Sequence, residues 1–221
     1  MTDHRIILPK DAMPEPTLRR LPWYLAYVSL LKSSGVESVS STQIAKEINV
    51  DASMIAKDLS FLNIKGKTRI GYEVKRLERE LQDFLGFKKG HNAVIVGVGS
   101  LGAALIQDSG LLRYGLSIVA GFDINPSIVG SSICNVPVYD IAELSERCSL
   151  LNAEIGIVTV PTDHAQEVSD RLVNAGIKAL WNFTPFRISA KDGIVIQNTS
   201  IYAHLAVMYN RIGIQKDRTK K

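Results

Sequence analysis

A glycine-rich turn directly behind a short apolar run constrains the fold of this chain more than any other feature. The segment HNAVIVGVGSLGAALI places Gly97, Gly99 and Gly102 in the pattern G-x-G-x-x-G. Asp123 follows 21 residues after the third glycine and closes a second apolar run, LSIVAGFD. In a dinucleotide-binding fold, the glycines make a tight turn, admit a pyrophosphate and let helix and strand pack closely. The acid binds the adenine ribose and disfavours the extra phosphate of NADP(H), so the pattern predicts NAD(H).

The alternative is a tight strand-to-helix turn that binds nothing, but strand, helix, second strand and acid all agree with a real site. The pyrophosphate is expected at the positive end of the helix that begins near Ser100. The segments TVPTDH and NFTP follow later strands, where open α/β sheets bind ligands, although Pro and Asn also end strands for local reasons. The candidate cofactor residues are Gly97, Val98, Gly99, Ser100, Leu101, Gly102, Asp123, Thr159, Pro161, Asn182, Phe183 and Pro185.

From residue 91 onward, predicted strands alternate with predicted helices. The strands are 92–96, 116–122, 136–139, 154–160, 178–183 and 193–197, and the helices are 100–108, 140–148 and 163–174. This alternation predicts a parallel sheet wound by right-handed crossovers. The last helix, IYAHLAVMYNRI, carries an apolar stripe that either packs on its own sheet or contacts a second copy of the chain. The stripe consists of Ile201, Leu205, Met208 and Ile212.

The part of the chain before the glycine turn is predicted to be helical. Thr17 is the expected N-cap of the first helix, and Pro22 is tolerable there if it lies within the first turn. Gly35 fits the end of this helix. Ser40 and Gln43 form a capping box that opens a second helix.

A third helix, ASMIAKDLSFL, can be capped by Asp51, and two short helices joined by a tight turn are typical of a helix-turn-helix. The next segment, NIKGKTRIGYEV, predicts a β-hairpin wing. A fourth helix, VKRLERELQDFL, is expected to end at Gly86. The third helix should expose Ser53, Met54, Lys57 and Ser60 and bury Ile55, Leu59 and Leu62.

Charge is distributed unevenly along the chain. Residues 1–90 hold 15 Lys and Arg against 11 acids, residues 91–215 hold 7 against 10, and residues 216–221 hold 4 against 1. The basic first part favours a polyanionic partner, although a solvated basic face is the simpler alternative. Helix-turn-helix spacing combined with a wing favours double-stranded DNA. The candidate DNA-binding residues are Ser53, Lys57, Ser60, Lys65, Lys67, Arg69 and Tyr72.

Several classes of protein are disfavoured. Cys134 and Cys148 lack metal-ligand spacing and are expected to be reduced thiols, with a redox-active pair as the alternative. The histidines form no metal-binding motif, so no metal is predicted. No apolar run reaches the roughly 18 residues of a membrane span. The N-terminal segment MTDHRIILPKDAMPEP lacks a signal-peptide pattern and is interpreted as a short arm, so we expect a cytoplasmic protein that does not bind membranes.

Enzymatic activity is also not expected, and no catalytic residue is assigned. A dehydrogenase needs an acid/base residue and a substrate-orienting cation near the nicotinamide, which His164 and Arg187 could supply. The chain has no separate stretch for a substrate domain, however. A CoA- or nucleotide-binding ligase subunit shares the glycine pattern but has no use for a helix-turn-helix. We therefore predict α/β architecture with a winged-helix DNA-binding domain (1–86), a Rossmann NAD(H)-binding domain (87–199) and a C-terminal segment (200–221) of a helix and a basic tail, to which the resemblance described next assigns dimerisation.

Taken together, these segments resemble the Rex family of bacterial NADH-sensing transcriptional repressors, from about residue 14 to residue 210. The resemblance implies a homodimer on a palindromic operator, with Rossmann domains paired through an exchanged C-terminal helix. It also implies that NAD+ and NADH compete for one pocket and that NADH releases the DNA. The matching segments are PEPTLRRLPWYLAYVSLL, VSSTQIAKEINV, AKDLSFL, GKTRIGYEV, VGVGSLGAAL, FDINPSIVG, TVPTDHAQEV and AGIKALWNFTP.

The resemblance implies that the three glycines and Asp123 bind the nucleotide. It also implies that the candidate residues of the third helix and of the wing bind DNA, with the exception of Arg69. The chain departs from the family pattern in four places, one of which is a pair of residues. Ala56 replaces the arginine of the family's R-K-D-L. In the wing, Thr68 and Arg69 replace an arginine and a glycine of the family pattern. Asp108 stands where the family has a tyrosine near the nicotinamide, and Ser200 stands where the family has an acid at the start of the last helix. The first two changes bear on operator sequence and the last two on NADH/NAD+ discrimination, so a regulator that uses NAD(H) structurally is the second interpretation.

Overall fold

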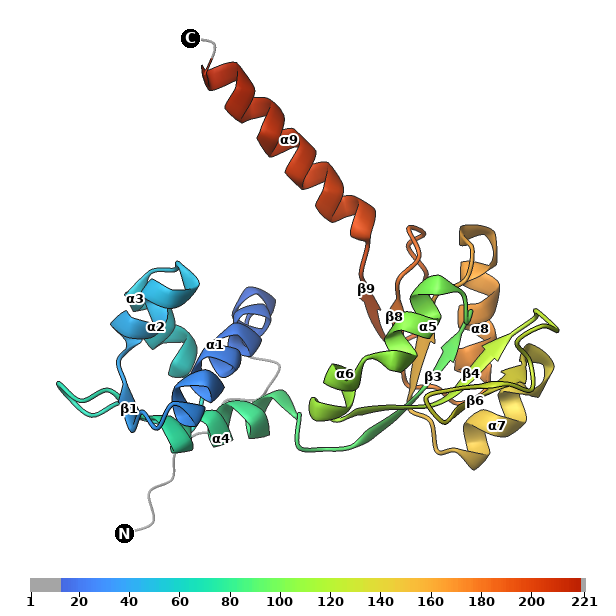
Figure 1. The fold of residues 1–221 in the computed structure, drawn as a ribbon, viewed down its shortest axis with the longest axis horizontal. Coiled ribbons are helices and arrows are strands. Elements are labelled where there is room, and N and C mark those ends of the chain that lie inside the picture. Colours follow the sequence, from blue (N-terminus) through green and yellow to red (C-terminus); the bar gives the residue numbers. More distant parts are fainter. Residues whose placement is uncertain (1–12, 220–221) are drawn as a thin grey trace. The chain divides into compact units, whose positions relative to one another are not determined.

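The computed structural model describes the backbone of residues 13–219 and the side chains of residues 13–213. Residues 1–12 of the predicted N-terminal arm (1–16) and the side chains of the basic tail (216–221) lie outside the described residues, and the last two residues of that arm belong to the first helix. The chain divides between Lys89 and Gly90 into two compact units, each with its own core (Figure 1).

The first unit is a small helical domain whose four helices share one apolar core. Each helix contributes fully buried side chains to it, among them Leu21, Ile44, Leu59 and Leu77. The elements are α1 (Glu15–Ser33), β1 (Ser38–Val39), α2 (Ser41–Ile48), α3 (Ala52–Leu59), β2 (Tyr72–Glu73) and α4 (Val74–Leu85).

The start of α1 differs from the prediction. The helix begins at Glu15 after Pro14, so Thr17 lies inside the helix and is not its N-cap. The segment Pro-Glu-Pro sets helical backbone angles before Thr17 is reached, because proline fits the first turn of a helix. Pro22 consequently lies in the helix interior and not in the first turn.

The local signals of the helix-turn-helix are confirmed. The Ser40 hydroxyl accepts from the Gln43 backbone N–H at 3.1 Å, and Gln43 Oε1 accepts from the Ser40 N–H at 2.8 Å. Asn49, with a left-handed φ of 53°, ends α2, and the Asp51 carboxylate caps α3 through the Ser53 N–H at 2.7 Å. Three residues therefore separate the two helices. Gly86 ends α4 as predicted, whereas α3 ends at Leu59 and so is shorter than expected.

The predicted wing hairpin is only partly formed. Strand β2 pairs antiparallel with β1, with Tyr72 opposite Val39, and not with residues of its own segment. Within the segment, one bridge joins Lys67 and Gly71, through N–H to carbonyl hydrogen bonds of 2.7 and 2.8 Å. The loop that these two hydrogen bonds close is too short to contain a second strand. The partner of β2 is therefore β1, which comes before α2.

The second unit is a seven-stranded sheet in the order β5-β6-β4-β3-β7-β8-β9, parallel except for the short edge strand β5. The predicted α/β class, a winged helix followed by a doubly wound parallel sheet, is confirmed. The elements are β3 (His91–Val96), α5 (Ser100–Gln107), α6 (Ser109–Arg113), β4 (Leu116–Asp123), β5 (Ser132–Ile133), β6 (Val136–Asp140), α7 (Leu144–Leu150), β7 (Ile155–Val158), α8 (Ala165–Asn174), β8 (Ala179–Asn182), β9 (Val195–Asn198) and α9 (Ile201–Thr219).

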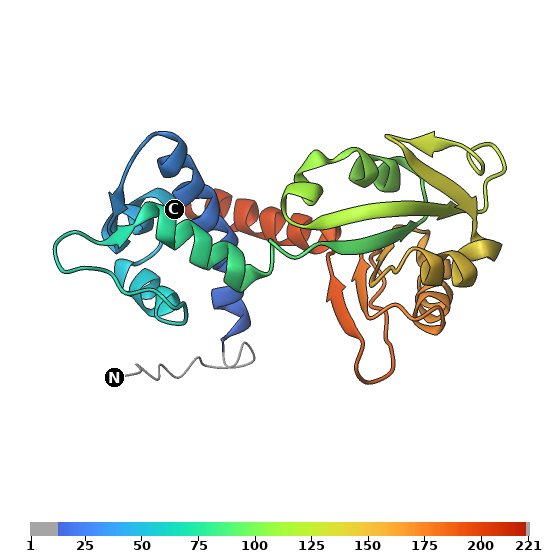
Figure 2. The same ribbon diagram turned by 90° about the horizontal axis from the view of Figure 1, so that it is seen from below.

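Helices cover both faces of this sheet, as Figure 2 shows. The period-two alternation of a strand sends successive side chains to opposite faces. Val94 and Val96 of β3 accordingly join the core under α7 and α8, whereas Ala93 and Ile95 join the core under α5. The central strand is buried on both sides, which explains its uninterrupted apolar run.

Two short elements of the second unit escaped the sequence prediction. Helix α6 is a five-residue helix that is capped by Asp108. Strand β5 forms a hairpin with β6 through Cys134 and Asn135, both of which have positive φ. Such two-residue turns match the twist of the flanking strands, but they carry no clear signal without the usual glycine.

The two cysteines occupy different environments. Cys148 is buried in the core beside α8, and burial raises the pKa of its thiol to about 11. Cys134 lies exposed in the hairpin turn, and both cysteines are free. At pH 8 in the folded chain, we expect iodoacetamide to alkylate Cys134 and to spare Cys148.

Denaturation should make both thiols reactive, which peptide mass mapping would show. An unfolded Cys148 ionises near pH 8.5, so its contribution to stability should be complete below that pH and decline as pH rises to about 11. Equal labelling of both thiols in the folded chain would contradict this assignment.

Helix α9 leaves its apolar stripe uncovered. Ile201, Met208 and Ile212 are each at least half exposed, so packing of the stripe on its own sheet is the wrong alternative. Within residues 13–219, no helix is long and apolar enough to cross a membrane.

Candidate functional site

The sheet of the second unit reverses its direction of growth between β3 and β7. From β3, the chain continues through β4 to β6 on one side and then from β7 through β8 to β9 on the other. The glycine turn follows β3, and Thr159 to Pro161 follow β7, so both segments lie at the carboxyl edge beside this switch point. Open α/β sheets bind their ligands in this crevice.

The three glycines are explained by different contacts. Gly97 has a φ of 93°, and a Cβ there would lie 2.8 Å from the Thr159 carbonyl oxygen. At Gly102, a Cβ would come within 2.1 Å of the Gly97 carbonyl oxygen. At Gly99, it would meet nothing within 4 Å. The first and third glycines are thus required by the packing of the protein itself, whereas the second keeps an exposed surface open.

Asp123 is fixed against the glycine turn. Its Oδ2 accepts from the Val98 N–H at 2.6 Å, and its Oδ1 accepts from the Ile124 and Asn125 N–H groups at 2.8 and 2.9 Å. The carboxylate therefore joins the end of β4 to the turn after β3. Thr159 adds a second tie, because its hydroxyl donates to the Gly97 carbonyl at 2.7 Å.

A pocket of about 330 Å³ opens beside these groups and brings together three predicted residues, Gly97, Asp123 and Pro161. Its size falls within the usual range for small-molecule sites. Sequence reasoning missed most of its walls, because apolar residues after strands look like ordinary core. The remaining lining residues are Val96, Ile124, Ile141, Val160, His164, Glu167, Val168 and Arg171.

The segment NFTP does not line this pocket. Asn182 is fully buried, and its amide donates to the Phe186 carbonyl at 2.6 Å and to Asn198 Oδ1 at 2.8 Å. Its Oδ1 accepts from the Thr184 N–H at 3.0 Å. Asn182 therefore holds the loop after β8 in shape. Phe183 packs on Trp181 with ring centroids 4.7 Å apart, and Pro185 is exposed.

The remaining glycine-turn residues differ in exposure: Val98 is buried, Leu101 partly so and Ser100 exposed. Two departures from the family pattern have local roles. Asp108 accepts from the Gly110 N–H at 2.8 Å and caps α6, and the Ser200 hydroxyl accepts from the Ala203 N–H at 3.2 Å at the start of α9. Both are good N-cap residues.

The first unit presents the predicted face of α3 and the following loop. Ser53, Met54, Lys57 and Ser60 are exposed, and Ile55, Leu59 and Leu62 are buried, as predicted. Lys65, Lys67 and Arg69 are exposed in the wing loop. Tyr72 is half-buried against Gly66, and burial raises the pKa of its phenol. Tyr72 thus supports the base of the wing.

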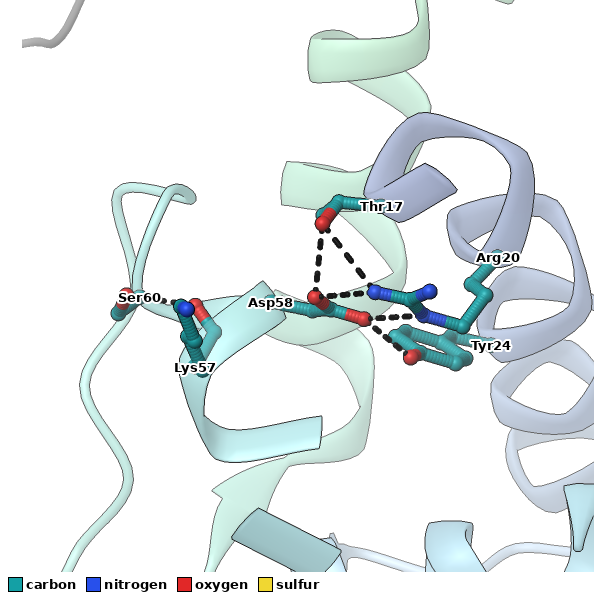
Figure 3. A network of polar contacts seen from close by, with 6 residues as sticks. All are labelled: Thr17, Arg20, Tyr24, Lys57, Asp58 and Ser60. Atoms are coloured by element: carbon teal, nitrogen blue, oxygen red, sulfur yellow. Dashed lines mark hydrogen bonds and ion pairs between the residues drawn. The ribbon is translucent and has the colours of Figure 1, made fainter. Parts of the chain in front are cut away.

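A carboxylate on the buried side of α3 was missed by sequence reasoning. Asp58 is 1% exposed and accepts bonds from Thr17, Arg20 and Tyr24 of α1 (Figure 3). Burial raises the pKa of the Asp58 carboxyl, but the hydrogen bonds from these groups lower it by more, so the pKa lies below its usual value. Asp58 lies in AKDLSFL, one of the segments that resemble the family, and this is the signal that could have drawn attention to it. Its hydrogen-bond partners, however, belong to another helix and lie far from it in the sequence.

The pair that the dehydrogenase alternative invoked does not share the pocket. His164 lines the pocket, but Arg187 does not. Among the residues whose side chains are described, no three His, Cys, Asp or Glu groups could hold a metal ion.

A winged helix with an exposed basic face, joined to an α/β unit with a glycine-turn pocket, defines the class of transcription regulators that carry a nucleotide-binding fold. Residues 12–60 match the family model "Putative DNA-binding protein N-terminus", and residues 88–186 match "CoA binding domain". The "Redox-sensing transcriptional repressor Rex" of Porphyromonas gingivalis is 58% identical over 90% of this chain and 92% of its own. That of Bacteroides fragilis is 55% identical over 98% of this chain and 99% of its own.

Two solved structures are similar over the whole fold. RSP in complex with beta-NAD+ and operator DNA has a TM-score of 0.88 and 33% identity, covering 94% of this chain and 96% of its own. RSP in complex with beta-NADH has a TM-score of 0.85 and 33% identity, covering 95% and 98%. The chain belongs to the Rex family of redox-sensing transcriptional repressors. The prediction of a regulator and not an enzyme is confirmed by this membership.

Proposed function

We propose that this chain represses transcription by binding operator DNA as a homodimer and that NADH, in competition with NAD+, releases it. The observation that carries the proposal is one chain holding both a glycine-turn pocket with an ordered acid and a winged helix that exposes Lys57, Lys65, Lys67 and Arg69. The complexes of RSP with beta-NAD+ and operator DNA and with beta-NADH support it.

The nucleotide is proposed to lie across the switch point of the sheet. Its pyrophosphate would lie over the turn from Gly97 to Gly102, including Val98, Ser100 and Leu101, at the positive end of α5. Asp123 would bind the adenine ribose. Thr159 and Pro161 would form the wall after β7, and Asn182, Phe183 and Pro185 the wall after β8, where Asn182 acts by holding the loop.

DNA binding is assigned to the exposed side of α3 and to the wing. Lys57, Lys65, Lys67 and Arg69 would supply phosphate or groove contacts, and the hydroxyls of Ser53 and Ser60 would lie beside them. Tyr72 would act by supporting the wing. In this proposal residues 1–86 bind DNA, residues 87–199 bind NAD(H) and residues 200–221 join two copies through the uncovered stripe of α9. The protein would work in the cytoplasm, where its proposed ligands meet.

Release requires NADH to bind the DNA-free state more tightly than the DNA-bound state. Reversing occupancy from about 1:99 to 99:1 needs a difference of roughly 5.5 kcal/mol, which a dimer can share between two pockets.

The test is operator affinity at fixed salt across a series of NADH/NAD+ ratios. A palindromic duplex recovered from a random pool by the unaltered protein serves as the probe, and fluorescence anisotropy gives the dissociation constant. We expect affinity to fall by at least about 100-fold from NAD+ to NADH, about half of the free-energy difference above. Asp123→Ala should blunt this response and leave affinity without nucleotide unchanged.

A regulator that uses NAD(H) only structurally is a second candidate, because Asp108 and Ser200 serve as helix caps here. The same titration separates the two. Equal affinities in NADH and NAD+ would favour structural use, and failure to select any duplex would overturn DNA binding itself.

A further inference from the structure

The Asp58 carboxylate lies on the side of α3 opposite the side chains proposed to meet DNA. In Figure 3, Lys57 and Ser60 point away from α1, whereas Asp58 points toward it. Lys57 and Asp58 are neighbours in α3 and Ser60 is its C-cap, so any rotation of α3 that displaces Asp58 also displaces Lys57. The buried and exposed sides of α3 therefore move together.

Three side chains on one face of α1 converge on this carboxylate. Thr17, Arg20 and Tyr24 follow helical spacing, so they point in the same direction. Thr17 donates to Oδ1 at 2.9 Å and Tyr24 to Oδ2 at 2.5 Å. Arg20 donates through Nε to Oδ2 at 2.7 Å and through Nη2 to Oδ1 at 2.8 Å. Each carboxylate oxygen thus accepts two hydrogen bonds.

This arrangement specifies orientation in a way that apolar packing does not. Ile55 and Leu59 already bury the inner face of α3. Apolar contacts have no direction, whereas a bidentate guanidinium–carboxylate pair fixes a plane and an angle. Taking a charge out of water costs free energy, and an apolar residue would fill the same space without that cost. The directional constraint is what the charged residue adds.

We propose that Asp58 is a positioning residue for operator recognition: its contacts with Thr17, Arg20 and Tyr24 set the rotation of α3 that presents Lys57 and Ser60 to DNA. The inference rests on the proposed function, since it concerns how the same DNA-binding surface is held. It assigns α1, which carries no proposed DNA contact, a part in sequence discrimination.

Electrostatics alone predicts the opposite result from positioning. Replacing Asp58 by asparagine removes a negative charge near the proposed phosphate contacts, which would raise affinity for every DNA sequence. Loss of positioning would lower affinity for the selected duplex and leave affinity for unrelated DNA unchanged or slightly raised. The sign of the change for the selected duplex therefore separates the two effects.

The experiment measures the full-length Asp58→Asn variant on two duplexes at fixed salt. One is the palindromic duplex selected by the unaltered protein, and the other has the same composition in scrambled order. We expect the ratio of the two affinities to fall about 10-fold, a loss comparable to one wrong base pair. NADH affinity, a property of the second unit, should not change. A selected duplex is a precondition, so failure to obtain one counts against the proposed function and not against the role of Asp58.

The first unit offers a matched control. Glu78 of α4 is also buried, at 7% exposure, and accepts from Ser29 at 2.9 Å and Lys32 at 2.5 Å on α1. Glu78→Gln breaks an equivalent contact that does not involve α3. It should lower the melting temperature but keep the affinity ratio.

Two milder variants keep the proposal testable if Asp58→Asn does not fold. Tyr24→Phe keeps the buried ring and removes one hydrogen bond, and Arg20→Lys keeps the charge and removes the fork. Each should reduce the ratio by less than Asp58→Asn does. An unchanged ratio in folded Asp58→Asn, or in both milder variants if that protein does not fold, would overturn the proposal, as would an equal loss in Glu78→Gln.

Discussion

Replacing Gly99 by serine is expected to weaken NADH binding by about 10- to 100-fold and to leave the stability of the ligand-free chain unchanged. A Cβ at Gly99 meets no atom of the protein within 4 Å, and serine is a good N-cap for α5. The folded chain therefore tolerates the change. The added side chain would occupy the space through which a pyrophosphate approaches the backbone.

Calorimetric titration with NADH and the melting temperature of the ligand-free protein test this together. Gly102→Ser is the contrasting variant, because its Cβ would come within 2.1 Å of the Gly97 carbonyl oxygen. It should lose both stability and binding. Gly90→Ser also adds a side chain in open space, but outside the turn, and should change neither. Wild-type NADH affinity in Gly99→Ser would place the nucleotide elsewhere.

Arg69→Gly is expected to weaken DNA binding while making the chain slightly more stable. Arg69 has a φ of 68°, in the turn that the Ile70 N–H closes on the Lys67 carbonyl at 3.1 Å. A residue with a side chain pays about 1–2 kcal/mol in this conformation, of which glycine's greater unfolded-state entropy offsets about 0.4–1 kcal/mol. Loss of an arginine contact in a groove typically costs about 1–3 kcal/mol of DNA affinity. The two changes have opposite signs, which a misfolded variant could not produce.

Anisotropy titrations at several salt concentrations, together with thermal melts, provide the measurement. The slope of log affinity against log salt should become shallower by about one unit if Arg69 contacts a phosphate. Asn152→Gly is the matched control, because Asn152 has a φ of 49° in the second unit. It should gain less stability, because asparagine tolerates this conformation better than arginine does, and its DNA affinity should not change. Unchanged DNA binding in Arg69→Gly would remove this residue from the interface.

The sequence predicted well wherever the interaction partners lie close together along the chain. The capping box of Ser40 and Gln43, the Asp51 cap and the helix end at Gly86 are all contacts inside one turn of helix. The glycine turn belongs to the same group, because strand, turn and helix form a single local unit. Such signals do not depend on the rest of the fold.

Predictions failed where a residue has a distant partner. Thr17 resembles a helix cap, but its hydroxyl binds Asp58 on another helix. The wing strand was expected to pair within its own segment, but Tyr72 pairs with Val39, which precedes the whole helix-turn-helix. Nor does the sequence show that the Asn182 amide bonds to Asn198 of the next strand.

The sequence alone determined the periodicities, the caps, the glycine turn and the uneven charge, and through these the class of each unit. Tertiary structure alone decided which walls enclose the pocket beside Asp123, which buried carboxylate holds α3 and where the wing strand pairs. The physical reason is that local hydrogen bonds are specified by neighbouring residues. Long-range contacts depend on side chains that meet only after the chain has folded.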